Sequence, residues 1–400
     1  MFDSGKGTAE EPYIIATEKQ LRGFAGSLND KIDYTNKFVA LGDDITLSSD
    51  EWKPVGRSDY LFNGTFDGQG HTVSGMTLGS AEKPFALDKE NLYIGFFGVL
   101  GPQSVVKNLK LTDVAFHTTF GATAYVGGIA GVMQGSTVRN DFTGAVIDGC
   151  SVSGNLSLKG DKGNQFVGGI TGMQYKGAVI NSVAKVDASG VVLAGDLAEV
   201  GGLVGLNNRG LVANCRSDST IYGSGSRENG NEGMAVASNL VACNAGMLVN
   251  CYGSGNVTTK EHSVYAGMVS GWVTGIGKSY NCWYNLDSTM IVGAETDNPL
   301  TVNPVESIGT KVASGVNDEG DAYTGGLVDR MTGYNSESYS ALAGELNNTF
   351  AAFPADITVY GLKADALKNW AYTDGTVTFG DTNAAVNYVQ PDCEKVEKPE

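Results

Sequence analysis

A pair of glycines separated by two residues recurs inside an apolar patch along the middle of the chain. Clear copies occur in the segments IGFFG, GGIAG, GGITG and GGLVG, and weaker copies occur in SNLVA and AGMVS. The glycines of these patches are Gly95, Gly98, Gly128, Gly131, Gly169, Gly172, Gly202, Gly205 and Gly267, and the copies follow one another at intervals of 28 to 41 residues. Self-similarity at such a period indicates a stack of structural repeats.

A second anchor follows most of these glycines after 11 to 14 residues. It is an Asn or Asp beside apolar residues, at Asn108, Asp148, Asn181, Asn214, Asn250 and Asn281. Between the anchors, runs such as CSVSGNLSL alternate apolar and polar residues, as strands with one buried face do. No sustained helical pattern occurs from 38 to 284, so turns must connect the strands. We therefore predict an all-β parallel β-helix whose units of ~30 residues bury their apolar faces against one another.

Two structural reasons for the glycines remain open at this stage. They could supply positive φ at turns, or they could stand where neighbouring coils approach too closely for a Cβ atom. A phosphate-binding loop is excluded, because the glycines precede strands instead of a helix N-terminus and no Lys-Ser or Lys-Thr follows any of the four clear copies. The alignment of Ile129, Ile170 and Leu203 along one axis is the decisive test of the stacked arrangement.

Both ends of a solenoid need covering, because open strand edges promote aggregation. The segment Thr17-Glu18-Lys19-Gln20 reads as a capping box, and Leu21, Phe24, Ala25 and Leu28 follow at helical spacing, which predicts an N-terminal capping helix. Tyr339, Leu342, Ala343 and Leu346 repeat that spacing, and WAYTDGTVTFG has a turn between two strand-like arms. The second set predicts a small C-terminal cap of a helix plus a hairpin.

The Gly-Leu-x-Gly core over roughly Gly95 to Tyr284 resembles the GLUG repeat of secreted and surface-attached bacterial proteins. EEPYIIATEKQLRGFAGSLN and FNGTFDGQGHTVSGMTL are similar to the leader of such repeats, and NCWY resembles the end of a last repeat. The resemblance implies a right-handed β-helix and an adhesin-like role. The repeat glycines are lost at Asn239, Ala242 and Ser270, where we expect an irregular coil. The expected divisions are 1–90 (N-terminal cap and first coils), 91–290 (repeats), 291–390 (C-terminal cap) and 391–400 (tail).

Charge narrows the classes of partner. The 27 Lys and Arg against 44 Asp and Glu give a net charge of −17, and no basic block is present, which disfavours nucleic acid and anionic membranes. No apolar run approaches the ~20 residues of a membrane-spanning helix. Met1 precedes the polar stretch FDSGKGTAEEPY. We expect an exported protein of the cell surface or extracellular space, with its export signal or lipid anchor removed.

Candidate catalytic and metal sites are weak. Adjacent Asp43 and Asp44 are similar to the acid and base pair of polygalacturonase-type hydrolases, but the Arg-x-Lys of those enzymes is missing, and solvated turn residues are the commoner explanation. His71, His117 and His262 have no partner at zinc-ligand spacing. The carboxylates of DGQG and NDEGD match no calcium motif. We therefore expect no catalytic residues, no metal and no cofactor.

Four of the six cysteines, Cys150, Cys215, Cys251 and Cys282, occupy one place in their repeats. That periodicity predicts an interior ladder of thiols, because neighbouring coils ~4.8 Å apart only approach disulfide geometry. Late in the chain, aromatic residues gather at Tyr265, Trp272, Tyr280, Trp283 and Tyr284. Such rings could stack on sugars as a ligand platform, or they could fill the last coil beneath the C-terminal cap, which is the explanation that we favour.

Three functions fit these observations. The leading hypothesis is a non-enzymatic adhesin-like protein whose rigid side face binds another surface protein or a glycan, because a stacked scaffold has little to order on binding. The second is a carbohydrate-active β-helix enzyme, either a polysaccharide lyase or a glycoside hydrolase. The third is a passive spacer.

Overall fold

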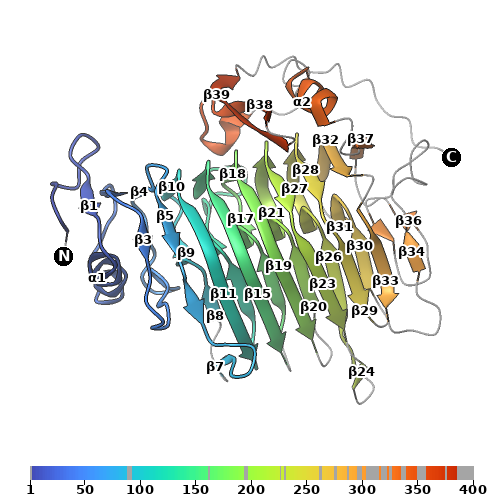
Figure 1. The fold of residues 1–400 in the computed structure, drawn as a ribbon, viewed down its shortest axis with the longest axis horizontal. Helices are drawn as coiled ribbons and strands as arrows, with labels where there is room; N and C mark the ends of the chain where they lie inside the picture. Colours follow the sequence, from blue (N-terminus) through green and yellow to red (C-terminus); the bar gives the residue numbers. More distant parts are fainter. Residues whose placement is uncertain are drawn as a thin grey trace.

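The chain folds into an elongated stack of parallel strands (Figure 1). The computed structural model describes residues 2–87, 92–160, 163–192, 197–225, 227–228, 231–260, 264–273, 277–285, 288–294, 300–302, 315–316, 322–323, 327–334, 339–348, 357–373 and 376–384. Consecutive coils pair strand on strand in register, as in Val105–Lys107 against Val146–Asp148. The predicted parallel β-helix is confirmed.

Four faces repeat in each complete coil, and we name them A to D. Face A stacks β1 (Tyr13–Ile15), β2 (Phe38–Leu41), β4 (Thr65–Asp67), β10 (Val105–Lys107), β14 (Val146–Asp148), β18 (Ala178–Ile180), the second halves of β21 (Val204–Ala213) and β27 (Val241–Val249), the start of β32 (Lys278–Asn285), and β37 (Leu327–Tyr334).

Face B has the longest strands. It stacks β3 (Ile45–Thr46), β5 (Thr72–Ser74), β6 (Thr77–Leu78), β7 (Phe85–Leu87), β11 (Lys110–Phe120), β15 (Ser151–Gly160), β19 (Val183–Val192), β22 (Arg216–Asp218), β23 (Thr220–Gly225), β28 (Tyr252–Ser254), β29 (Val257–Lys260), the end of β32, and β33 (Met290–Ala294).

Faces C and D follow in the chain and meet at the repeat glycines. Face C stacks β8 (Leu92–Ile94), β12 (Ala124–Gly127), β16 (Gln165–Gly168), β20 (Leu197–Gly201), β26 (Met234–Ser238) and β30 (Val264–Gly267). Face D stacks β9 (Phe97–Leu100), β13 (Ala130–Met133), β17 (Thr171–Tyr175), the first halves of β21 and β27, and β31 (Ser270–Val273). A hairpin of β24 (Arg227–Glu228) and β25 (Asn231–Glu232) extends from one coil.

The interior ladder runs as the sequence predicts. The Ile129 N–H donates to Ile170 O at 3.0 Å, and the Ile170 N–H donates to Leu203 O at 2.9 Å. All three side chains are fully buried in one continuous core. The repeat glycines act by close approach, since none of the nine has a positive φ. A Cβ at Gly202, for example, would lie 2.0 Å from Asn239 O on the next coil.

Positive φ belongs instead to the Asn anchors that join faces A and B. Asn108, Asn181, Asn214, Asn250 and Asn281 have φ between 45° and 56°, a conformation that Asn tolerates better than most residues. The anchor predicted at Asp148 is wrong by one residue. Asp148 pairs with Lys107 and Ile180 in face A, and Gly149 takes the turn with φ 63°.

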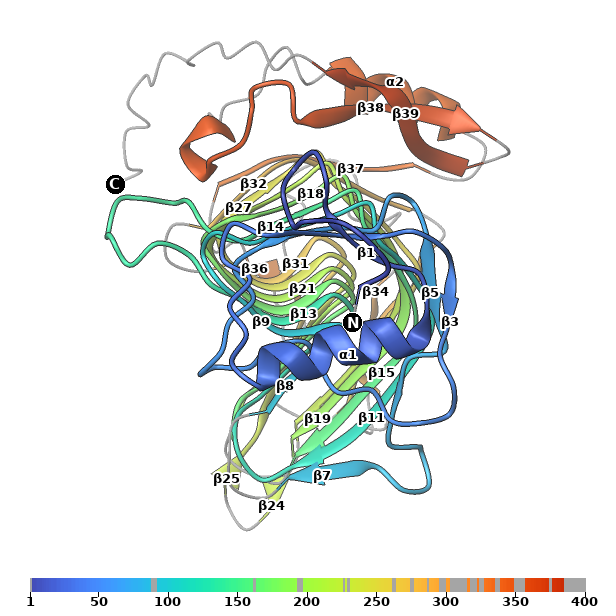
Figure 2. The same cartoon turned by 90° about the vertical axis from the view of Figure 1, so that its left-hand side faces the viewer.

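The N-terminal cap forms as predicted. Helix α1 (Glu18–Asn29) begins at the N-cap Thr17, whose Oγ1 accepts the Gln20 N–H at 3.3 Å, and its Leu21, Phe24 and Leu28 are buried. Figure 2 shows α1 lying across the first coils. Its apolar face closes this end of the core.

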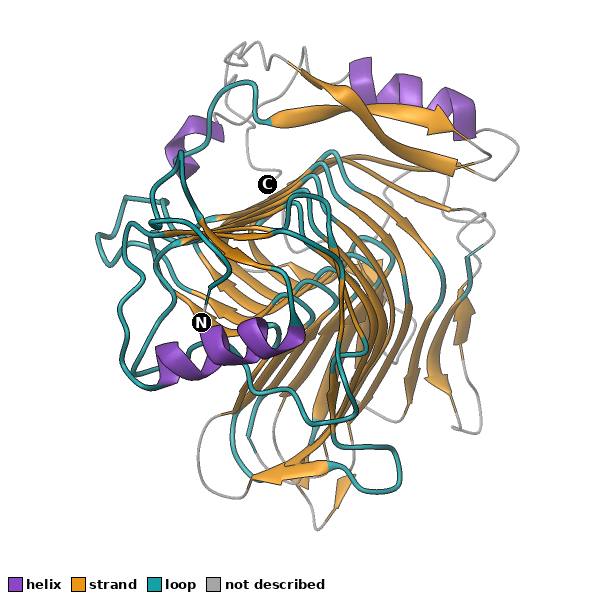
Figure 3. Cartoon of the chain, turned by 60° about the vertical axis from the view of Figure 1, so that its left-hand side comes forward, coloured by secondary structure: helices purple, strands orange, loops and turns teal. Residues whose placement is uncertain are grey.

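The C-terminal helix and hairpin also form, but they lie in a different place from the predicted cap. Helix α2 (Tyr339–Asn348), the 3₁₀ helix η4 (Ile357–Tyr360) and the hairpin of β38 (Leu367–Thr373) and β39 (Thr376–Ala384) lie along the side of the stack, over face A (Figures 1 and 3). We call them the C-terminal unit. At the end of the stack, β34 (Leu300–Val302), β35 (Gly315–Val316) and β36 (Ala322–Tyr323) add antiparallel strands to faces B and C. The predicted tail lies outside the described residues.

A second hydrophobic core holds the C-terminal unit against face A. Outward-facing residues of the coils, among them Ile180, Leu211 and Val249, pack with Leu346 and Trp370 of the unit. The Asn anchors add polar contacts. Asn181 and Asn214 donate their amide N–H groups to Ala366 O at 2.8 Å and Lys368 O at 2.9 Å. The unit is thus fastened to the middle of the solenoid.

Candidate functional site

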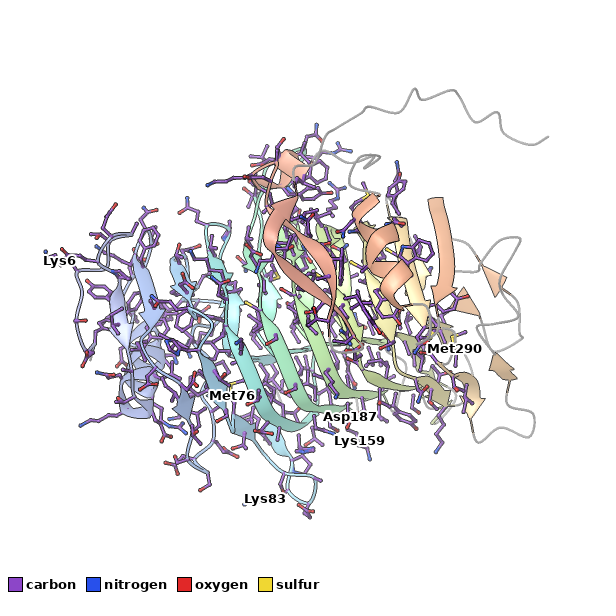
Figure 4. The ribbon with its side chains drawn as sticks, turned by 45° about the horizontal axis from the view of Figure 1, so that its top comes forward. Lys6, Met76, Lys83, Lys159, Asp187 and Met290 are labelled. Carbon is purple, nitrogen blue, oxygen red and sulfur yellow. The ribbon has the colours of Figure 1, made fainter. Side chains whose placement is uncertain are left out.

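A groove of about 530 Å³ crosses the outer side of face B. It spans β11, β15, β19 and the neighbouring strands β22 and β23. Its polar lining includes Asp113, Asn155, Lys185, Asp187, Asp218 and Thr220. Figure 4 labels Asp187, which lies on β19, and Lys159, which lies on the neighbouring β15 outside the groove lining.

An irregularity in β11 shapes the groove. The register between β11 and β15 shifts between Leu111 and Val114, so Thr112 and Asp113 stand opposite a single residue. Asp113 has φ 54°, and its partner strand carries Gly154, where a Cβ would lie 2.0 Å from Val114 O. Bulges of this kind redirect side chains and are frequent next to functional sites.

The groove contains an acceptor that lacks a partner. Asn155 Oδ1 is shielded from solvent and has no hydrogen-bond partner among the described residues. A buried amide oxygen left in that state costs about 1–3 kcal/mol. At the adjoining edge, Asp218 is occupied, because it forms an ion pair with Arg216 and accepts a hydrogen bond from Ser254. Asp113 and Asp187 remain exposed.

The five predicted platform aromatics do not share one surface. Tyr284 is in the main core at 2% exposure. Trp283 is buried at the second core, and Tyr280 packs against the same core. Tyr265 and Trp272 remain half-buried on faces C and D, where their rings stack with centroids 5.9 Å apart. Three of the five aromatic side chains therefore pack in or against the two cores, and only Tyr265 and Trp272 form a half-buried ring pair outside them.

A row of aromatic side chains on face C was not predicted. Tyr93, Tyr125 and Phe166 occupy equivalent places on successive coils, and their ring centroids are 5.3 and 5.0 Å apart. The Tyr125 and Phe166 positions are each three residues before the first glycine of a pair, Gly128 and Gly169, so aligning the repeats by their glycines would have found them.

Glu199 takes the next place in that row. It pairs with Phe166 on one side and Val236 on the other, and it is 3% exposed. Burial raises the pKa of its carboxyl to about 8, and Oε2 has no hydrogen-bond partner among the described residues. Burial, with the nearby Glu199 charge, also raises the pKa of Cys243.

The carboxylates considered as a catalytic pair serve the local backbone. Asp44 accepts the Thr72 N–H at 2.8 Å and lies 3.2 Å from His71 Nδ1, and these contacts lower its pKa. Asp43 accepts the Asp44 N–H at 2.8 Å. His117 is far along face B on β11, and His262 lies outside the described residues. In the described part of the chain, no three His, Cys, Asp or Glu side chains gather as a metal site.

The thiol ladder has the predicted position. Cys150, Cys215, Cys251 and Cys282 are buried and free, as is Cys243, while Cys393 lies outside the described residues. The Cys215 N–H lies 3.4 Å from Cys251 Sγ on the next coil. Burial raises the pKa of Cys150 to about 12, so this thiol is poorly suited to nucleophilic chemistry.

Comparison with known proteins supports the fold over most of the chain, whereas sequence relatives match only part of it. No family model matches the chain. A crystal structure described as a putative immunoglobulin A1 protease from Bacteroides ovatus superimposes with a TM-score of 0.58 over 94% of this chain and 95% of that one, at 18% identity. That likeness establishes a shared fold.

Two sequence relatives match short regions. A "Putative Gly-rich membrane protein" of Evansella cellulosilytica is 30% identical over 135 residues, and halomucin of Haloquadratum walsbyi is 26% identical over 171 residues. These matches cover 33% and 38% of this chain but only 14% and 2% of the relatives, so the chain spans a small part of their length. Among the described residues, no helix is long and apolar enough to cross a bilayer.

Proposed function

We propose that the chain is an exported, surface-exposed binding protein that holds a glycan without acidic groups in the groove of face B. The relatives described as a membrane protein and as halomucin support a surface location. The predicted GLUG-repeat resemblance supports the same location. The net charge of −17 disfavours acidic polymers, whereas hydroxyl and amino groups suit the groove carboxylates.

The observation that carries the proposal is the orphaned Asn155 Oδ1 within the groove. A rotation of the Asn155 side chain toward the groove would let a sugar hydroxyl donate to this oxygen, while Thr220 and the exposed Asp187 offer further polar contacts beside it. The groove volume lies within the range of about 300–1,000 Å³ that small-ligand sites occupy. Strands on a stacked scaffold need little ordering, so modest contacts give useful affinity.

The experiment is a glycan array read with the native chain and with Asn155→Ala. The native chain should bind a subset of neutral or amino-sugar glycans, and Asn155→Ala should weaken that binding at least tenfold. Removing an orphaned acceptor should leave thermal stability unchanged or raise it, which separates a ligand contact from a structural one. Lys159→Ala on the same face is the matched control and should bind as the native chain does.

Binding that is equal in Asn155→Ala and the native chain would place the ligand elsewhere. If the chain binds proteins and no glycan, the partner in this proposal is a protein.

A carbohydrate-active enzyme is the second candidate, because Asp113, Asp187 and Lys185 converge on the same groove. Two carboxylates that flank a sugar can act as general acid and base. A reducing-sugar and unsaturated-product assay on the glycans bound in the array distinguishes the two functions. Turnover that Asp187→Asn abolishes would establish the enzyme and refute the non-enzymatic proposal.

A further inference from the structure

A second cavity, of about 430 Å³, lies near the N-terminal end of the solenoid, apart from the groove of face B. Its apolar wall includes Trp52, Leu78, Phe85, Leu92 and Tyr93. The segment 51–57 forms one side, and the strands β6, β7 and β8 together with Asn29 at the end of α1 supply the rest. Tyr93 also begins the aromatic row of face C.

The wall is rigid. The Trp52 indole N–H donates to Gly95 O at 3.1 Å, its backbone N–H donates to Thr77 O at 2.7 Å, and its ring stacks on Phe96 with centroids 5.2 Å apart. Its one polar atom is satisfied within the protein and the side chain is 1% exposed, so Trp52 is the fixed support behind the apolar wall. A preformed apolar cavity of this size is typical of a small-molecule site.

Charge at the cavity is opposite in sign to that of the whole chain. Lys53 and Arg57 line the cavity, are exposed, and form no ion pair with any described residue. Arg57 and Lys31 each lie 5.4 Å from the centroid of the Tyr60 ring. Lys31 is therefore a third cation near the cavity. Glu51 also lines the cavity, but its Oε1 accepts the Gly79 N–H at 3.3 Å. Unpaired cations in a protein of net charge −17 can attract an anion locally.

We propose that this cavity binds an amphipathic monoanion, with its apolar body against Phe85 and Tyr93 and its carboxylate at Lys53 and Arg57. The apolar body gains by leaving water, and the carboxylate pairs with the guanidinium in the geometry that arginine favours. This site is independent of glycan binding at face B.

Isothermal titration calorimetry with decanoate tests the proposal on the whole chain. Decyltrimethylammonium has the same chain with the opposite charge and should bind at least tenfold more weakly. Hexanoate lacks four methylene groups, and at about 0.8 kcal/mol for each buried group it should bind roughly a hundredfold more weakly. The first comparison tests the contribution of the negative charge, and the second tests the contribution of burying the alkyl chain in the cavity.

Charge reversal supplies the matched variants. Lys53→Glu combined with Arg57→Glu should weaken decanoate binding at least tenfold, and both residues are exposed, so the fold tolerates the change. Lys159→Glu reverses an exposed charge on face B and should leave decanoate binding unchanged. Absence of decanoate binding at millimolar concentration, equal binding of the two decyl ions, or equal binding by the double variant would each overturn the proposal.

Discussion

The buried carboxyl of Glu199 makes the stability of this fold depend on pH in an unusual direction. Glu199 is 3% exposed, and burial raises its pKa from the ordinary value of 4.5 to about 8. The folded state therefore keeps a proton that the unfolded chain releases. Below pH 4.5 both states hold the proton. Stability falls as the pH rises from 4.5 towards 8, and it changes no further above that range.

The size of the effect follows from the two pKa values. At about 1.4 kcal/mol for each pKa unit, the change from 4.5 to about 8 corresponds to about 5 kcal/mol lost at alkaline pH, as an upper figure. Glu199→Gln keeps the shape of the protonated side chain and cannot ionise. The variant should exceed the free energy of unfolding of the native chain by less than about 1 kcal/mol at pH 5 and by several kcal/mol at pH 9.

Urea unfolding of both chains at pH 5, 6, 7, 8 and 9 measures this difference. Asp187→Asn removes an exposed carboxylate and controls for the loss of one negative charge. If the difference between Glu199→Gln and the native chain stays within about 0.5 kcal/mol from pH 5 to pH 9, the carboxyl is ionised or solvated in the folded state. The burial argument would then fail.

Three further predictions concern the repeat itself. Gly202→Ala should destabilise the fold by about 3 kcal/mol in urea titrations, because its Cβ would lie 2.0 Å from Asn239 O. Gly26→Ala on α1 is the control and should be neutral or stabilising, because a Cβ there meets nothing within 4 Å. Equal effects of the two substitutions would contradict the close-approach role of Gly202. Asn214→Ala should make the C-terminal unit sensitive to limited proteolysis, because Asn214 donates to Lys368 O, while Asn108→Ala, whose amide donates to Asp67, should leave the unit protected. A thiol-reactive reagent should leave Cys150, Cys215, Cys243, Cys251 and Cys282 unmodified in the native chain. Mass spectrometry under denaturing conditions should count six free thiols, and any smaller number would indicate a disulfide.

The axial stacking could be predicted from the sequence because each repeat uses the same residues for the same contact. Ile129, Ile170 and Leu203 each come directly after the first glycine of a pair, and they stack. The Asn anchors were found for the same reason, and the exception is informative. In VIDGC the turn position equivalent to the Asn anchors is Gly149, because Gly also adopts positive φ. Choosing the polar residue Asp148 therefore gave the wrong register.

The sequence did indicate that the C-terminal unit lies along the side of the stack, but the indication is in the strands that the unit covers and not in its own helix and hairpin. A strand with one buried face alternates, but three consecutive apolar residues occur at Ala178–Ile180, and similar runs occur at Leu211–Ala213 and Met247–Val249. Runs of this kind indicate strands covered on both faces. These coils present the apolar residues that the C-terminal unit covers. Three coils before Ala178–Ile180, β4 has Thr65 and Asp67 at the equivalent outer positions and lies beyond the second core.

The groove of face B, in contrast, depends on an event that no periodicity reveals. Its form follows from the two-for-one register shift at Asp113, and the alternation of β11 alone cannot show where β15 fails to match it. A repeat sequence specifies which residues stack, because stacking recurs in every coil. A binding site arises where the recurrence is interrupted, so it needs the register of two particular coils. Glu199 replaces the apolar residue type that its neighbours Phe166 and Val236 use, and its pKa is raised there. The orphaned Asn155 lies on the strand that faces the register shift of β11. Such interruptions are where function is best sought in this fold.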